Sequence, residues 1–259
     1  MTGLLSIGIA AAAGPEVAEQ LAPAAERAGL HALWVNDTPG NDALEVLAAA
    51  AQATERLVLA TGVIPVDRRG ADEIRARVAE LGLPADRLVL GIGSGSGAVG
   101  ALARVTDAAR ALGSGEPVCD RVVVGALGPK MRRRAVEVSD GVLLSWLTPD
   151  AARAQAAEAR EVAPETHVAL YVRAATDAAA VDRMDREAAR YAGFPAYRAN
   201  LERLGIDVRD TVIRPEVLAA GIRHYCHTVD EVVLRAMVAN DDADDYLRFI
   251  EAVGEAIPG

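Results

Sequence analysis

The sequence predicts an α/β fold, a (β/α)8 barrel of the TIM type, and three observations support this prediction. The chain has 259 residues, close to the roughly 250 that one such barrel needs. Short apolar runs alternate along it with longer, alanine-rich stretches of helical period. Apolar runs of this kind are typical of parallel strands that are buried on both faces.

The elements follow in order along the chain. The opening run lacks a preceding positive segment and leads to a Gly-Pro turn, so we expect a strand there rather than a signal peptide. Eight strands are expected, at Leu4–Ala10, Ala32–Val35, Leu57–Thr61, Leu88–Gly91, Val122–Val124, Val142–Ser145, His167–Val172 and Glu231–Ala236. Helices are expected near Pro15–Ala28, Ala43–Thr54, Ala71–Leu81, Val99–Leu112, Pro129–Val138, Asp150–Val162 and Asp242–Ile257.

Alanine favours these helices and their close packing on a sheet. Between the seventh and eighth strands lies a longer helical stretch, about residues 176–222. We therefore expect one domain over residues 1–259 with a helical insertion before its last strand.

Composition and charge exclude several classes of protein. The net charge is −10, with scattered basic residues, so nucleic acid and anionic membranes are not expected partners. No apolar run reaches the roughly 18 residues of a membrane span. Cys119 and Cys226 form no disulfide framework, which fits a cytoplasmic protein. His224 and His227 have no further ligand cluster, so no metal site is expected.

The most informative segment runs from Val122 to Pro149. A predicted strand ends in Gly125-Ala126-Leu127-Gly128, and a helix starts at Pro129, where a missing N–H costs nothing. Glycines let backbone N–H groups approach a ligand, and a helix N-terminus attracts phosphate through its amides and dipole. The pattern predicts a phosphate seat; a tight turn that binds nothing remains the alternative.

The same segment resembles the bacterial luciferase-like monooxygenases, the flavin- and deazaflavin-dependent barrels. Asp140-Gly141-Val142, followed by Trp146-Leu147-Thr148-Pro149, is especially similar to the branch that uses coenzyme F420. Leu21–Asp37 and Ala53–Arg69 are similar to the family's first helix with its second strand, and to its third strand. The resemblance runs from about Leu4 to about Asp150 and rests on the order and spacing of these segments.

The resemblance implies an oxidoreductase that binds F420, or else FMN, and acts on a small organic substrate. With F420 the implied reaction is hydride transfer, and with FMN it is oxygen-dependent monooxygenation. It also implies a homodimer that pairs through early helices, which the small residues of Ala43–Thr54 permit. The alternative is a non-catalytic barrel that binds a flavin or deazaflavin, since this chain is shorter than a usual member.

The resemblance further implies where the cofactor lies. The family's third strand carries a bulge with a non-prolyl cis peptide against which the ring rests, and the matching bond is Gly62–Val63, after Thr61. The phosphate would bind Gly125–Gly128 at the start of the Pro129 helix. Lys130, in the first turn of that helix, is placed to add charge.

Other candidates stand at predicted strand ends. Gly93 and Ser94 lie in a loop over the active face, where Ser94 and Ser96 are placed to bond a cofactor tail; a plain flexible loop is the alternative. Asn36 and Asp37 are the candidate catalytic residues because they end the second strand. Relatives often have a histidine or glutamate near that position, and Asp37 also suits a turn role before Thr38-Pro39-Gly40.

The remaining charged residues divide between the two ends of the barrel. Arg173, after the seventh strand, faces the active end, where it would bind an anionic group or form a surface salt bridge. His31 and His167 precede strands and so belong to the opposite end. Arg132, Arg133 and Arg134 fan around a helix and are expected on a solvated face. The dinucleotide pattern Gly95–Gly100 falls on the fourth unit, which argues against a nucleotide fold. No hydrolase triad, HExxH motif or Walker loop is present.

Overall fold

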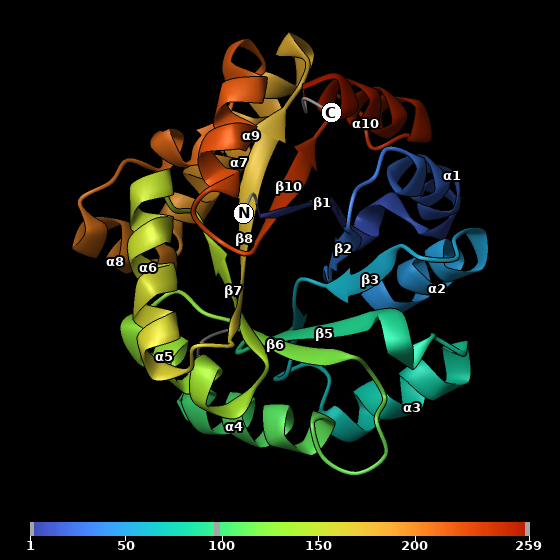
Figure 1. Cartoon of the computed structure of the whole chain (residues 1–259), viewed down its shortest axis with the longest axis vertical. Coiled ribbons are helices and arrows are strands. Elements are labelled where there is room, and N and C mark those ends of the chain that lie inside the picture. Colours follow the sequence, from blue (N-terminus) through green and yellow to red (C-terminus); the bar gives the residue numbers. More distant parts are fainter. Residues whose placement is uncertain (1–2, 96–98, 257–259) are drawn as a thin grey trace.

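The computed structural model describes residues 3–95 and 99–256, and it is a closed parallel barrel with helices outside the strands (Figure 1). The last long strand pairs with both the first and the preceding one, which closes the ring. The (β/α)8 prediction is confirmed. The long strands of the described residues are β1 (Leu4–Ala10), β2 (Ala32–Asn36), β3 (Val58–Thr61), β5 (Leu88–Gly93), β6 (Arg121–Gly125), β7 (Gly141–Ser145), β8 (His167–Ala175) and β10 (Glu231–Met237).

Local signals explain where the helices begin. Pro129 and Pro149 occupy first helical positions, and the side chains of Asp42 and Thr148 accept a hydrogen bond from the first turn of their helices. The helices are α1 (Pro15–Arg27), α2 (Ala43–Ala53), α3 (Ala71–Leu81), α4 (Ala101–Leu112), α5 (Pro129–Val138), α6 (Pro149–Val162), α7 (Val181–Gly193), α8 (Pro195–Leu204), α9 (Leu218–Cys226) and α10 (Ala243–Ala256).

Two strands differ from expectation in ways that matter for function. The third is interrupted: β3 ends at Thr61, and the two-residue β4 (Ile64–Pro65) pairs with β5. The bond between them, Gly62–Val63, is cis, as predicted. The seventh, β8, continues to Ala175, so Arg173 lies within the strand rather than after it.

The segment between β8 and β10 contains α7, α8 and α9, with the short strand β9 (Val212–Ile213) beside β8. Helices α7 and α8 pack on each other and on the barrel through an apolar group that includes Trp146, Ala188 and Leu201. Sequence periodicity located this helical segment, but not its contact with the loop after β7.

The barrel interior is filled by side chains. Trp34 and Tyr171 are its largest members and meet edge to face, with ring centroids 6.1 Å apart. A second, larger core lies between the strands and the outer helices. Because the interior is packed, a ligand has room only at an end of the barrel.

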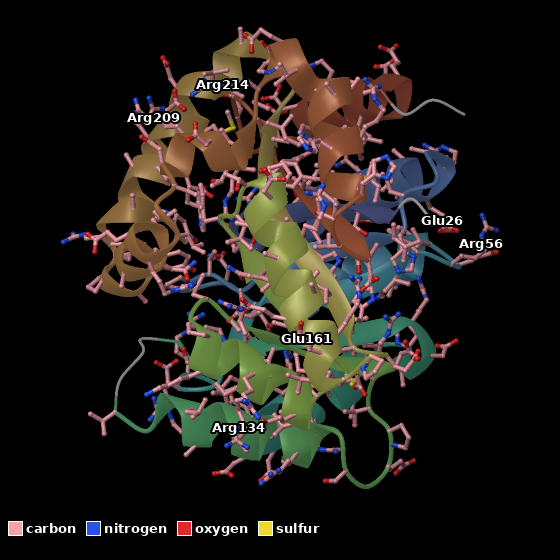
Figure 2. All side chains as sticks on the ribbon, turned by 60° about the vertical axis from the view of Figure 1, so that its left-hand side comes forward. Glu26, Arg56, Arg134, Glu161, Arg209 and Arg214 are labelled. Atoms are coloured by element: carbon pink, nitrogen blue, oxygen red, sulfur yellow. The ribbon has the colours of Figure 1, made fainter. Side chains whose placement is uncertain are left out.

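The outer surface carries several charge pairs. Glu26 and Arg56, labelled in Figure 2, lie side by side with 3.4 Å between their charged groups. Because the Arg56 side chain is 79% exposed, solvent screens this pair and it contributes little to stability. Within the described residues, no helix is long and apolar enough to cross a membrane, and no group of three acidic, histidine or cysteine side chains is placed to hold a metal ion.

Candidate functional site

The carboxyl ends of the parallel strands bring most of the predicted site residues to one end of the barrel, called here the mouth. Asn36 ends β2, Gly93 ends β5 and Gly125 ends β6. The broken third strand places Gly62 and Val63 beside them. This is the end at which barrel enzymes place their active sites, because the loops after each strand meet there.

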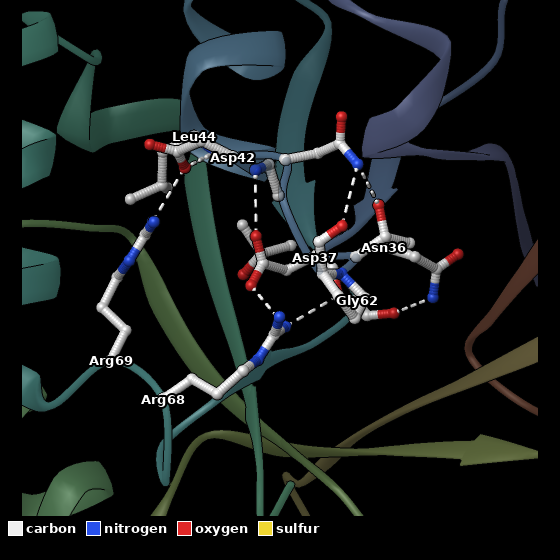
Figure 3. A network of polar contacts seen from close by, with 12 residues as sticks. Asn36, Asp37, Asp42, Leu44, Gly62, Arg68 and Arg69 are labelled. Carbon is white, nitrogen blue, oxygen red and sulfur yellow. Dashed lines mark hydrogen bonds and ion pairs between the residues drawn. The ribbon is translucent and has the colours of Figure 1, made fainter.

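Asn36 holds the backbone of the broken strand. Its side-chain Nδ2 donates a hydrogen bond to the carbonyl oxygen of Gly62 (Figure 3). The adjacent Thr61 hydroxyl donates to Gly91 O at 2.9 Å, which ties β3 to β5. Asn36 Oδ1 is buried and has no donor among the described residues. The Asn36 side-chain amide therefore positions Gly62. Its Oδ1 remains an acceptor without a protein donor among the described residues.

Val63 lies across the mouth between two glycines. A Cβ placed on Gly93 would lie 2.5 Å from one Val63 methyl, and a Cβ on Gly125 would lie 3.0 Å from the other. Both distances are too short for an ordinary contact. Glycine at the ends of β5 and β6 is therefore what allows Val63 to occupy this place.

Asp37 is committed to structure. Its Oδ1 accepts from the backbone N–H of Ala43 at 3.1 Å, and its Oδ2 pairs with Arg68 at 2.9 Å (Figure 3). The side chain is only 5% exposed. With both oxygens engaged, these contacts support the turn role over the catalytic one. Ser94 follows Gly93 and is half-buried, whereas Ser96 lies outside the described residues.

The turn from Gly125 to Lys130 offers several free amides, though not all that were expected. The N–H of Ala126 donates to Leu143 O at 3.0 Å, so this amide belongs to the sheet and is unavailable to a ligand. The N–H groups of Leu127, Gly128 and Lys130 have no acceptor among the described residues. No atom lies within 4 Å of a Cβ built on Gly128, which leaves open space there.

Arg132 corrects one expectation, since it does not belong to a solvated face. It is 5% exposed. Its guanidinium reaches back to Leu127 O at 2.9 Å and across to Glu158 of α6 at 2.5 Å. Burial follows because α5 packs on α6 along this side. Arg132 thus fixes the carbonyl of the turn and leaves its amides free.

Two buried arginines, of which the sequence indicated only one, share the mouth. Arg173 of β8 and Arg235 of β10 are register partners, 4% and 6% exposed. Side chains alternate along a strand, and both arginines share the parity of interior residues Tyr171 and Val233. Arg173 Nε pairs with Glu187 at 3.0 Å, and its Nη1 donates to Ser145 Oγ at 2.8 Å.

The two arginines affect the ionisation of Glu187 and Tyr171 in the mouth. Burial opposes ionisation of Glu187, but Arg173 and Arg235 outweigh it and hold the pKa of that carboxyl below its ordinary value. Burial raises the pKa of the Tyr171 phenol, although the same two arginines oppose the shift. Tyr171 therefore keeps its proton and remains a hydrogen-bond donor.

The opposite end of the barrel holds a closed polar cluster. Glu231 accepts from Ser6 Oγ and Trp34 Nε1, both at 2.6 Å, and its second oxygen lies 2.9 Å from His167 Nε2. Burial disfavours its charge, yet these donors outweigh burial and lower the pKa of Glu231. An open, mixed-charge pocket of about 530 Å³ adjoins it, lined by Arg121, Arg160 and Asp230 among others. His31 and His167 lie at this end, as predicted.

Comparison with known proteins shows which proteins share this fold. Residues 5–113 match the family described as luciferase-like monooxygenase. The whole chain also superposes on solved barrels of that kind. The chain therefore shares the barrel fold of these proteins and matches the luciferase-like family over residues 5–113. The luciferase-like resemblance noted in the sequence is confirmed over residues 5–113. Comparison with curated proteins found no match.

The solved structures share the fold at low identity. An F420-dependent secondary alcohol dehydrogenase with an F420–acetone adduct is 15% identical, with 98% of this chain and 99% of that chain covered and a TM-score of 0.69. An F420-dependent tetrahydromethanopterin reductase from Methanopyrus kandleri is 17% identical, with 99% and 98% covered and a TM-score of 0.67. A type II Baeyer–Villiger monooxygenase from Pseudomonas putida, in complex with FMN, is 12% identical, with 99% and 98% covered and a TM-score of 0.69.

Proposed function

We propose that this luciferase-like barrel is an oxidoreductase that binds a flavin or deazaflavin at its mouth, F420 in preference to FMN, and acts on a small organic substrate. One observation carries the proposal: the unpaired amides after β6 and the cis Gly62–Val63 bond lie at the same end of the barrel. Solved barrels of this fold include F420-dependent enzymes and an FMN complex. When bound, the cofactor supplies hydride transfer or, with FMN and oxygen, monooxygenation.

The phosphate of the cofactor would lie against α5. The N–H groups of Leu127, Gly128 and Lys130 have no acceptor among the described residues, and the helix dipole adds to their attraction for an anion. Arg132 holds the Leu127 carbonyl on its other side, so the turn does not have to rearrange. The exposed Lys130 ammonium adds a charge that solvent screens.

The ring would rest against Gly62 and Val63. Asn36 positions the Gly62 carbonyl, and Val63 closes the space between Gly93 and Gly125. These residues form a wall with one buried acceptor, Asn36 Oδ1, available to a donor on the ring. The preference for F420 rests on the resemblance of Asp140–Val142 and Trp146–Pro149 to that branch. Pairing of two copies through α2 stays a prediction.

Titration with each cofactor tests this site. Wild type is titrated with F420 and with FMN, following absorbance or fluorescence, beside Gly125→Val, Lys130→Ala and Arg133→Ala. Valine at position 125 would push on Val63, so binding should be lost. Lys130→Ala should weaken binding a few-fold, because its charge is screened. Arg133→Ala is the matched control, since Arg133 is an exposed cation on the same helix paired with Glu137.

Lys130 also offers a direct footprint, because it is the one lysine in the sequence. An amine-reactive reagent therefore labels this side chain and the amino terminus alone. We expect the cofactor to protect Lys130 and to leave the amino terminus unprotected. Wild type that binds neither cofactor, or Gly125→Val that binds equally well, would show that the site is wrong.

A further inference from the structure

Arg173 and Arg235 stand next to each other on the wall of the mouth that β8 and β10 form. Their Cα atoms are register partners, and both side chains are almost fully buried. Two guanidinium groups side by side in a buried place repel each other. Such an arrangement needs a balancing negative charge.

The protein supplies that balance only in part. Arg173 pairs with Glu187 at 3.0 Å, and nearby Arg183 pairs with Asp241. Arg235 Nη1 donates to Ala236 O at 2.6 Å, and no carboxylate among the described residues forms an ion pair with it. Three arginines and two carboxylates therefore leave one positive charge unmatched in this group.

Two uncharged polar groups nearby are also hydrogen-bond donors without an acceptor among the described residues. Tyr171 Oη is buried, keeps its proton and has no partner among the described residues. Trp146 Nε1 is likewise buried without an acceptor, and an indole N–H can only donate. A ligand that fits here brings acceptor oxygens and one negative charge.

Aromatic rings complete the surroundings. The Arg173 guanidinium lies 3.9 Å from the Trp146 ring centroid and 4.9 Å from that of Tyr191. Tyr191 in turn meets Tyr197 at 4.9 Å and Phe194 at 5.5 Å. Phe194 is 45% exposed, so this aromatic group reaches from the mouth to the surface along α7 and α8.

We propose that Arg235, with Arg173 held beside it, binds the carboxylate of the substrate, and that the substrate is a small aromatic acid whose ring packs against Trp146 and Tyr191. This rests on the proposed function, since it places the substrate at the same mouth. A single unmatched positive charge suits a monoanionic carboxylate better than a phosphate dianion. Arginine also binds a carboxylate through two parallel hydrogen bonds.

Benzoate is the probe, and benzyl alcohol is its neutral counterpart. Binding to the purified protein is followed by tryptophan fluorescence, because one of the two tryptophans, Trp146, stacks on Arg173. Arg235→Met removes the charge while keeping most of the volume, and Arg235→Lys keeps the charge. Arg209→Met is the matched control: its side chain is 70% exposed and projects from the surface (Figure 2). Circular dichroism and melting temperature establish that each variant is folded.

We expect benzoate to bind wild type and Arg209→Met alike, and Arg235→Met about 10- to 100-fold more weakly, as for a lost charged hydrogen bond. Arg235→Lys should recover part of that loss in benzoate affinity. The affinity for benzyl alcohol should be the same in wild type and in all variants. Equal benzoate affinity in wild type and folded Arg235→Met would overturn the proposal, as would an absence of benzoate binding to wild type. Lost F420 or FMN binding in Arg235→Met would also overturn it, because the arginines would then serve the cofactor. If benzoate binds while wild type binds neither cofactor, the proposed function fails and the anion site stands.

Discussion

The two ends of this barrel are both buried and both polar, but they differ in how their polar groups are satisfied. At the end opposite the mouth, both carboxylate oxygens of Glu231 form hydrogen bonds, with Ser6, Trp34 and His167. At the mouth, Tyr171 and Trp146 carry buried donors that no described residue accepts. The same strands therefore build a saturated cluster at one end and an unsatisfied one at the other.

This difference separates stability from binding within one fold. An unsatisfied buried polar group costs about 1–3 kcal/mol, so a protein retains one where a ligand or water completes it. We expect the saturated Glu231 cluster to contribute to folding rather than to ligand binding. The mouth gives up part of its stability in exchange for directed donors, as sites commonly do.

The largest effect is expected when the saturated cluster loses its acceptor. Glu231→Ala leaves the donors of Ser6, Trp34 and His167 without a partner, so the free energy of unfolding should fall by about 3–5 kcal/mol. Urea unfolding measures this. Glu202→Ala, on the surface of α8, is the control. Cofactor affinity per folded molecule should not change, and a loss below about 1 kcal/mol would contradict the contrast between the two ends.

The same carboxylate should give a smaller, pH-dependent effect. The folded pKa of Glu231 lies below its ordinary value of 4.5. Its contribution is therefore complete above pH 4.5 and is lost as the pH falls through the lower folded pKa. The stability difference between wild type and Glu231→Gln should shrink over that acidic range when urea midpoints are compared. A difference that stays constant between neutral and strongly acidic pH would show that Glu231 gains no stability from its charge.

Asp42, a satisfied carboxylate on the mouth side, should have an intermediate effect. It caps α2 through Leu44 N at 3.0 Å and pairs with Arg69 at 2.8 Å (Figure 3). It also pairs with Arg77 at 2.8 Å. Asp42→Ala should lower the free energy of unfolding by about 1–2 kcal/mol, as for a lost N-cap with its ion pairs. Asp42→Asn retains the cap and should lose less. Equal losses in the two variants would mean that the cap bond contributes nothing.

The fold and the backbone features of the site could be predicted from the sequence. Strand and helix order followed from apolar runs and helical period, and the cis bond at Gly62–Val63 followed from resemblance. Contacts between side chains of distant elements could not be predicted from the sequence. Arg235 lies in the middle of an apolar strand, and only barrel closure brings it beside Arg173. The sequence around Arg132 predicts a solvated face, because helix position alone does not reveal the packing of α5 on α6.

The smallest chemical change gives the sharpest comparison, since it removes one hydroxyl from each end. Ser6→Ala deletes a donor to the Glu231 carboxylate and should cost about 1.5–3 kcal/mol, the range for hydrogen bonds to charged groups. Tyr171→Phe deletes a buried hydroxyl that has no partner among the described residues. Its stability should therefore stay within about 1 kcal/mol of wild type, and any change should be a gain. Urea unfolding of both variants, with titration of benzoate and of each cofactor, makes the test. Tyr171→Phe should weaken the binding of whichever ligand accepts a hydrogen bond from the Tyr171 hydroxyl. Ser6→Ala should not weaken the binding of any of these ligands. If Tyr171→Phe instead destabilises the protein as much as Ser6→Ala does, the hydroxyl is already satisfied in solution and the contrast between the two ends fails.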